Sequence, residues 1–126
     1  MPAAPLVLLV DDSALVTEAL AVLVEAMGHR CATAASVAEA VAVARADPPT
    51  VILLDLTLPD GDGLALLDRL REAGAPIPVT VALTGHDDAA TRARCLAAGC
   101  RAVLTKPVST ATLLGGLADW TAGATP

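Results

Sequence analysis

Positive charge is scarce in this sequence and is nowhere clustered. The 126 residues include 8 lysine and arginine residues against 14 aspartate and glutamate residues, which gives a formal net charge of -6. Direct binding of nucleic acid needs clustered basic side chains that meet the phosphates, so the composition argues against that function. An acidic domain is better suited to a hard cation or to a basic protein partner.

Long apolar segments are also lacking. The segment from Leu15 to Met27 is interrupted by Glu18 and Glu25, and a bilayer span needs roughly 20 predominantly apolar residues. Residues 1–5 have neither the charged start nor the apolar stretch of a signal peptide. We therefore expect a cytoplasmic protein without a membrane segment.

Cysteine is sparse and follows no metal or disulfide pattern. Cys31, Cys95 and Cys100 are odd in number and form no C-x-x-C motif. In a cytosolic chain this pattern favours reduced thiols that serve as small apolar side chains. No cysteine or histidine ends a strand-like run, so zinc is not indicated.

Aliphatic residues, by contrast, are abundant, and their pattern predicts an α/β fold. Hydrophobic residues make up 55% of the chain. Continuous apolar runs at 6–10, 51–54, 79–83 and 102–105, with a weaker strand at 30–34, alternate with helix-length amphipathic segments. Continuous runs are typical of strands that are buried on both faces of a parallel sheet. We expect one domain over residues 1–126, with its core at about 6–119 and flexible tails at 1–5 and 121–126.

Reactive side chains follow four of these runs. They are Asp11, Asp12, Asp55, Thr84 and Lys106. The carboxyl ends of parallel strands meet at one edge of a sheet, so we expect these groups to form one site. Lys106 is the only lysine in a chain that otherwise uses arginine, and lysine offers a compact, mobile point charge.

The predicted site suits a magnesium ion and a phosphoryl group. Carboxylates that lie close together repel one another unless a cation joins them. A site with only oxygen ligands favours Mg²⁺. A carboxylate beside Mg²⁺ can attack phosphorus and carry an aspartyl phosphate. The Lys106 ammonium, the Thr84 hydroxyl and backbone amides would then stabilise the phosphoryl oxygens.

Four motifs in order give the chain its resemblance to a known family. They are Val10-Asp11-Asp12-Ser13, Leu54 to Gly63 (LDLTLPDGDG), Ala82-Leu83-Thr84-Gly85 and Leu104-Thr105-Lys106-Pro107. The chain resembles the receiver domain of two-component response regulators from about Leu6 to Asp119. The resemblance implies a doubly wound (βα)5 fold with a parallel sheet of strand order 2-1-3-4-5, as in flavodoxin and the chemotaxis regulator CheY.

The resemblance also implies a role for each site residue. Asp55 would accept the phosphoryl group from a histidine kinase or a histidine phosphotransfer protein. Asp11, Asp12, Asp55 and the Thr57 carbonyl would hold Mg²⁺. Thr84 would be the switch hydroxyl and Lys106 the phosphate clamp, followed by a cis bond to Pro107. Such a domain is a signalling phosphoacceptor and catalyses only its own phosphorylation and dephosphorylation.

The sequence departs from the family where most receivers carry a switch aromatic. Val103 stands three residues before Lys106, and Val108 replaces the usual phenylalanine after Pro107. An aromatic swing is therefore impossible, and the route of the signal to the face of the fourth helix, fifth strand and fifth helix must differ. A shift of the loop after Thr84 is the alternative.

Several interpretations stay open at this stage. Met1 favours a stand-alone regulator, whereas the segment around Thr84 and Arg94 to Gly99 is similar to receivers of hybrid histidine kinases. A flavodoxin-like carrier of flavin mononucleotide or a small Mg²⁺-dependent phosphotransferase would share the fold. We expect Asp60 and Asp62 to be solvated turn acids, and His86 is a candidate modulator of dephosphorylation. The downstream target is not indicated.

Overall fold

The computed structural model describes residues 4–85 and 88–122, which form alternating strands and helices. The strands are β1 (Leu6–Val10), β2 (Arg30–Ala34), β3 (Val51–Asp55), β4 (Thr57–Leu58), β5 (Gly61–Asp62), β6 (Val79–Thr84) and β7 (Ala102–Thr105). The helices are α1 (Ala14–Ala26), α2 (Val37–Ala46), α3 (Ala65–Glu72), α4 (Ala89–Ala98) and α5 (Thr110–Ala122).

Five of the strands form a parallel sheet in the order β2-β1-β3-β6-β7. Counted along the sheet strands alone, this is the order 2-1-3-4-5, so the predicted fold class is confirmed. The change of direction lies between β1 and β3, which are neighbours in the sheet. Ligands of such sheets bind beyond the carboxyl ends of the strands at this point.

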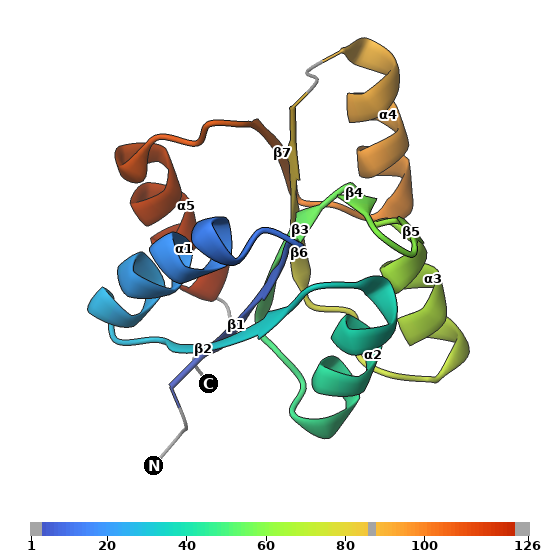
Figure 1. Cartoon of the computed structure of the whole chain (residues 1–126), viewed down its shortest axis with the longest axis horizontal. Coiled ribbons are helices and arrows are strands. Elements are labelled where there is room, and N and C mark those ends of the chain that lie inside the picture. The colour runs from blue at the N-terminus through green and yellow to red at the C-terminus, as the bar shows by residue number, and fades with distance from the viewer. Residues whose placement is uncertain (1–3, 86–87, 123–126) are drawn as a thin grey trace.

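Helices cover both faces of the sheet, with α1 and α5 on one side and α2, α3 and α4 on the other (Figure 1). Alternate residues of each strand point to opposite faces. Val7 and Leu9 of β1 pack in the core under α1 and α5, while Leu8 and Val10 pack in the core under the other three helices. All four side chains are almost completely buried, which explains why these strands read as unbroken apolar runs.

Serine side chains and a glycine mark three helix ends. The Ser36 side chain accepts a hydrogen bond from the Glu39 amide at 3.1 Å, and the Ser109 side chain accepts one from the Thr112 amide at 3.1 Å. Gly99 ends α4 with a φ of 105°, a left-handed conformation that only glycine adopts readily. These local signals therefore set the boundaries of the helices.

The chain turns at Pro59 and Asp60, and this turn connects β4 and β5, which form a short antiparallel pair. The tail expected from residue 121 does not begin at that residue, because α5 continues to Ala122. Thr121 is buried and donates its hydroxyl to the Leu117 carbonyl, four residues back in the same helix, at 2.6 Å.

Gly63 directly follows β5, and no larger residue fits there. A Cβ atom at this position would lie 2.1 Å from the Asp55 carbonyl oxygen. The Gly63 amide donates to the Leu56 carbonyl at 2.9 Å. This close approach fixes the β4–β5 pair directly beside the end of β3, and so beside Asp55.

No helix among the described residues combines the length and the apolar character needed to cross a bilayer.

Candidate functional site: an acidic cluster at the carboxyl ends of the strands

The expected site residues meet at one edge of the sheet. Asp11 follows β1, Asp55 ends β3, Thr84 ends β6 and Lys106 follows β7. These four strands are consecutive neighbours in the sheet. Side chains that are separated by up to 95 positions in sequence are thereby brought into contact.

Asp11, Asp12 and Asp55 form the acidic centre of the site. Each offers a carboxylate oxygen, and these oxygens lie within 4.8 Å of one another. Asp11 and Asp55 are buried, whereas Asp12 is exposed. Three negative groups this close favour a cation between them, because it offsets their repulsion. Among the described residues this is the one group of its kind that could hold a metal ion.

Lys106 is the cation that the chain itself supplies. Its Nζ lies 2.9 Å from Asp11 Oδ2 and 3.5 Å from Asp55 Oδ2. Burial by itself lowers the pKa of the Lys106 ammonium, but the hydrogen bond to Asp11 and the charges of Asp55 and Asp11 outweigh it, and the pKa is raised. The ammonium therefore stays charged throughout the neutral range.

Backbone contacts fix the two buried carboxylates in place. Asp11 Oδ1 accepts a hydrogen bond from the Ser13 amide at 2.9 Å, and the Asp11 amide donates to the Ala34 carbonyl at 3.0 Å. Asp55 Oδ1 accepts from the Thr57 amide at 3.2 Å. Both acids keep one oxygen directed toward Lys106 and the other held by the loop that follows their strand.

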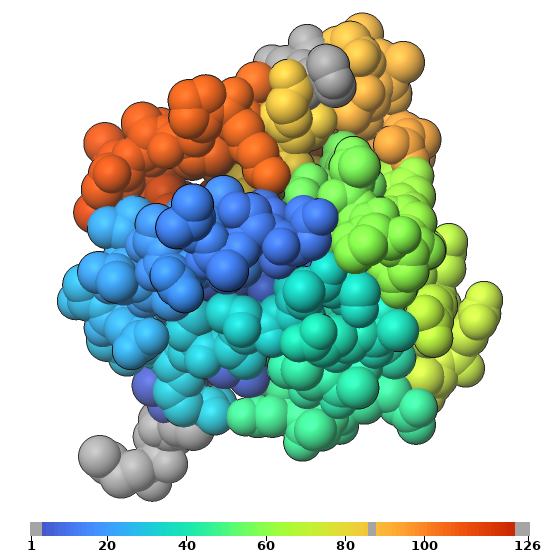
Figure 2. Space-filling view, in the orientation of Figure 1, coloured from blue at the N-terminus to red at the C-terminus, as the bar shows by residue number. Residues whose placement is uncertain are grey.

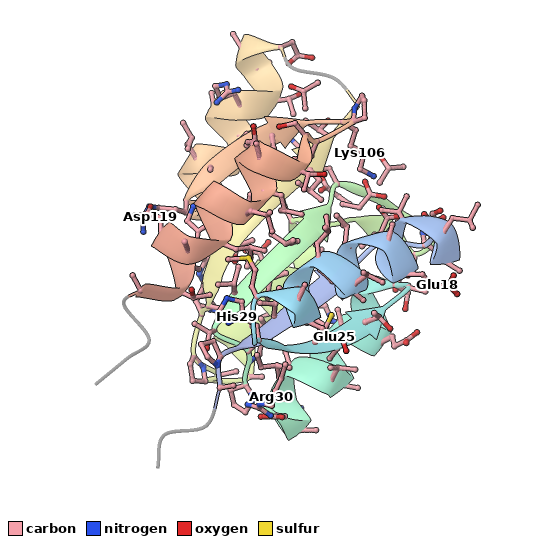
Figure 3. The ribbon with its side chains drawn as sticks, turned by 90° about the vertical axis from the view of Figure 1, so that its left-hand side faces the viewer. Glu18, Glu25, His29, Arg30, Lys106 and Asp119 are labelled. Carbon is pink, nitrogen blue, oxygen red and sulfur yellow. The ribbon has the colours of Figure 1, made fainter. Side chains whose placement is uncertain are left out.

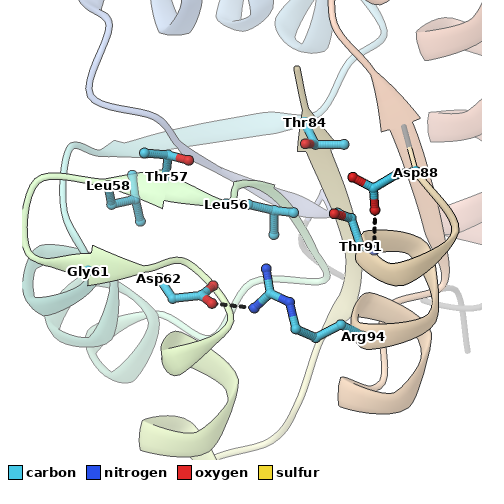
Figure 4. A pocket seen from close by; sticks show the side chains of 9 residues that line it. All are labelled: Leu56, Thr57, Leu58, Gly61, Asp62, Thr84, Asp88, Thr91 and Arg94. Carbon is cyan, nitrogen blue, oxygen red and sulfur yellow. Dashed lines mark hydrogen bonds and ion pairs between the residues drawn. The ribbon is translucent and has the colours of Figure 1, made fainter. Parts of the chain in front are cut away.

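Thr84 lies on the other side of Asp55 from Asp11, because β6 is the next strand of the sheet. It is buried, and with Thr57 it lines a groove at the mouth of the site (Figure 4). The Lys106 amide donates to the Thr84 carbonyl at 2.7 Å. Thr84, Lys106 and the two buried carboxylates thus lie at the carboxyl ends of four neighbouring strands.

Val103, Pro107 and Val108 all lie within three residues of Lys106. The Lys106–Pro107 peptide bond is cis. Val103 is buried and packs in the core beneath α4, and Val108 packs in the core beneath α5. His86 lies outside the described residues.

Asp60 and Asp62 are exposed, as we expected of solvated turn acids, but both also accept hydrogen bonds from backbone amides. Asp60 accepts hydrogen bonds from the Val37 and Ala38 amides at 2.9 and 3.0 Å, so it caps α2. These backbone hydrogen bonds lower the pKa of Asp60. Asp62 accepts from the Leu64 amide at 2.9 Å and forms an ion pair with Arg94. The partners of Asp60 lie more than 20 residues away, so no local sequence signal could reveal them.

A match across most of the chain identifies the family. Residues 7–118 match the response regulator receiver domain family. The chain belongs to this family of receiver domains. It is a signalling domain of the kind found in two-component systems, in which such domains interact with histidine kinases.

Relatives of this receiver include both regulators and a kinase. The chain is 40% identical over 100 residues to the photosynthetic apparatus regulatory protein RegA of Cereibacter sphaeroides, covering 79% of this chain and 54% of RegA. It is 33% identical over 104 residues to the sensor histidine kinase RcsC of Salmonella typhimurium, covering 82% of this chain and 11% of RcsC. The chain thus spans about half of RegA, and a small part of RcsC.

A solved structure shows the same architecture. The chemotaxis protein CheY4 of Vibrio cholerae superposes with a TM-score of 0.85 at 26% identity, covering 93% of this chain and 98% of CheY4. The fold expected from the resemblance is therefore confirmed by a solved relative.

Proposed function

We propose that this receiver accepts a phosphoryl group on Asp55 from the phosphohistidine of a histidine kinase or a histidine phosphotransfer protein in the cytoplasm. The observation that carries the proposal is the position of the Asp55 carboxylate. It is buried at the strand ends, 3.5 Å from the Lys106 ammonium and within 4.8 Å of two further carboxylates. This arrangement combines a nucleophile with groups that stabilise phosphoryl oxygens.

The donor set at the site fits a magnesium ion. Asp11, Asp12 and Asp55 offer only oxygen atoms, and the Thr57 carbonyl would add a further oxygen ligand. Mg²⁺ prefers such hard ligands and usually keeps several waters. When bound, the ion would neutralise charge on the phosphoryl oxygens and on the carboxylates.

The chain's own residues then carry the transfer. A carboxylate oxygen of Asp55 forms the new bond to phosphorus as the bond between phosphorus and the donor imidazole nitrogen breaks. The Lys106 ammonium and the Thr84 hydroxyl donate hydrogen bonds to the phosphoryl oxygens, and the Thr57 amide already directed at Asp55 is a further donor. Asp11 holds Lys106 within reach of Asp55 before the donor arrives.

The surface beside the site suits a helical protein donor. Leu15 and Val22 of α1 are 80% and 69% exposed. A groove of about 520 Å³ with largely apolar walls runs between α1 and the segment after β7, and it begins at Lys106. Figure 2 shows this hollow between the blue and orange segments, and Figure 3 shows Glu18 and Glu25 along α1. A donor helix with apolar and basic side chains would complement this face.

Phosphorylation would switch the face formed by α4, β7 and α5 toward a downstream protein target. Because Val103 cannot swing as an aromatic would, the change must travel through Thr84 and the loop that follows it.

Labelling by acetyl phosphate tests the proposal. We expect the wild type to gain one phosphoryl group only when Mg²⁺ is present, and Asp55→Asn to gain none, as measured by intact mass. Asp68→Asn, which changes an exposed carboxylate on α3, is the matched control and should be labelled like the wild type. A label on the Asp55→Asn variant that maps elsewhere would refute the assignment.

Thermal unfolding tests the metal site separately. Because Mg²⁺ would bind the folded state and relieve the repulsion, millimolar Mg²⁺ should raise the melting temperature of the wild type. Asp12→Ala should lose most of this increase, whereas Asp68→Asn should keep it. An undiminished response in Asp12→Ala would mean that the cation binds elsewhere.

A further inference from the structure

Helix α4 is attached to the rest of the domain by few apolar contacts. Of its residues, only Cys95 is buried. A groove of about 490 Å³ runs between α4 and the β4–β5 pair, and a second space of about 320 Å³ lies between α4 and α3. The helix is therefore separated from its neighbours along much of one side.

The ion pair between Asp62 and Arg94 crosses this gap. Both residues line both spaces, and Figure 4 shows the two side chains meeting across the groove. At the other end of α4, the Arg71 side chain donates to the Ala98 carbonyl at 2.6 Å. Two arginine contacts thus connect α4 to the elements on its open side.

Asp62 is an acceptor that is already held in position. Its Oδ1 accepts from the Leu64 amide at 2.9 Å, and its Oδ2 pairs with Arg94. Asp62 is also paired with Thr57 across the β4–β5 ladder. The Thr57 amide donates to Asp55 Oδ1 at 3.2 Å. A short series of contacts therefore runs from the proposed phosphoacceptor to Arg94 on α4.

The amino end of α4 reaches the same site from the opposite side. Asp88 caps the helix by accepting from the Thr91 amide at 2.7 Å. Asp88 and Thr91 line the groove together with Thr57 and Thr84. A phosphoryl group on Asp55 would engage both the Thr57 amide and the Thr84 hydroxyl. It would therefore act on the β4–β5 side of the groove and on the side near the amino end of α4.

We propose that the Asp62–Arg94 ion pair is a positioning device that holds α4 in its unphosphorylated position and thereby limits how readily Asp55 takes a phosphoryl group. This inference rests on the proposed function. With no switch aromatic between α4 and the site, the pair couples the Thr57 side of the site to α4. Breaking it frees α4 to follow Thr84 toward the phosphoryl group.

The size of the expected effect follows from the exposure of the pair. The Arg94 and Asp62 side chains are 51% and 46% exposed, and exposed ion pairs contribute little to global stability. A small free-energy difference between two positions of one helix still shifts their populations severalfold. We therefore expect a clear change in ligand affinity and almost none in the melting temperature.

Beryllofluoride with Mg²⁺, a mimic of the phosphoryl group, is the probe for this test. Asp62→Asn keeps an acceptor for the Leu64 amide but removes the charge, and Arg94→Gln removes the other partner. Each variant should bind beryllofluoride roughly two- to fivefold more tightly than the wild type and should be labelled faster by acetyl phosphate to the same extent. The double variant should show no further gain, and Arg94→Lys, which keeps the charge, should stay near the wild type.

The Arg30–Asp47 pair provides the matched control, because its side chains are 46% and 55% exposed and it lies far from the site. Arg30→Gln should leave beryllofluoride affinity unchanged. Unchanged or weaker affinity in both Asp62→Asn and Arg94→Gln would overturn the inference while the proposed function stands. A wild type that binds no beryllofluoride would instead refute the proposed function, and the inference with it.

Discussion

Helices α4 and α5 flank the same strand, β7, but they are held in opposite ways. α5 buries Leu113, Leu117 and Trp120 in the core, although Gly115 and Gly116 in its middle make it a poor helix by local propensity. α4 consists mainly of alanine and arginine, which favour a helix, yet buries only Cys95. Apolar burial fixes α5, whereas polar contacts fix α4.

This difference indicates which of the two helices can move. Displacing α5 would expose large apolar side chains to water, at a cost of about 1.5–3 kcal/mol for each one. Displacing α4 exchanges hydrogen bonds and an exposed ion pair for contacts with water, which costs far less. We therefore expect a signal from the strand ends to be carried by α4 while α5 stays in place.

The largest expected difference between α4 and α5 comes from removing one buried side chain from each helix. Leu117 and Cys95 are both completely buried. Leu117→Ala should lower the free energy of unfolding by about 3 kcal/mol, because it leaves a cavity. Cys95→Ala should lower it by about 1 kcal/mol. Urea denaturation followed by circular dichroism measures both, and equal losses would show that α4 is anchored as firmly as α5.

The two glycines of α5 provide a sharper test of how it is packed. A Cβ on Gly116 would lie 2.4 Å from the Trp120 ring, whereas a Cβ on Gly115 would meet nothing within 4 Å. Gly116→Ala should therefore lower the free energy of unfolding by about 1–3 kcal/mol. Gly115→Ala should raise it by up to about 1 kcal/mol, since only helix propensity changes. A stabilising Gly116→Ala would mean that Trp120 does not pack against this turn.

A pH titration tests the ion pairs that Lys106, just after β7, forms with Asp11 and Asp55. Because the pKa of Lys106 is raised in the folded state, its contribution to stability is present below its unfolded pKa of about 10.4 and is lost as the pH rises through the folded pKa. Without Mg²⁺, the wild type should be more stable than Lys106→Met near pH 8, and the difference should shrink above pH 10. A difference that stays constant to pH 11 would contradict the ion pairing.

The smallest expected effects concern α5 and Val103. On addition of beryllofluoride and Mg²⁺, amide resonances of Gly85, Asp88 and α4 should shift more than those of α5, and Thr84→Ala should weaken these shifts. The methyl groups of Val103 should keep one rotamer in both states, because this branched side chain is stiff and buried. A change of the Val103 rotamer while the amides near Thr84 stay unmoved would overturn the proposed route.

Much of the fold was predictable because its signals are local. The apolar runs each lie within a few residues of sequence, and the structure places strands at all of them. The convergence of Asp11, Asp55, Thr84 and Lys106 was also predictable, since parallel strands place their carboxyl ends at one edge.

The contacts of Asp60, Asp62 and Arg94 could not be predicted in this way. The partners of Asp60 and the ion-pair partner of Asp62 lie 22 to 32 residues away in sequence. Which arginine meets Asp62 depends on how α4 packs beside the β4–β5 pair. The hydrogen bond from the Leu64 amide to Asp62 is local, but it does not cap α3, which has no side-chain cap.

The sequence by itself determined the strands of the parallel sheet, the helices between them and the chemistry gathered at the strand ends, while the resemblance to the family supplied the order of the strands. Periodicity and the handed connection of parallel strands leave few alternatives for such a pattern. Only the tertiary structure decided how α4 is held, because an exposed ion pair adds little energy and leaves no periodic trace in the chain. The partners in such a pair are selected by the packing of elements that are far apart in sequence.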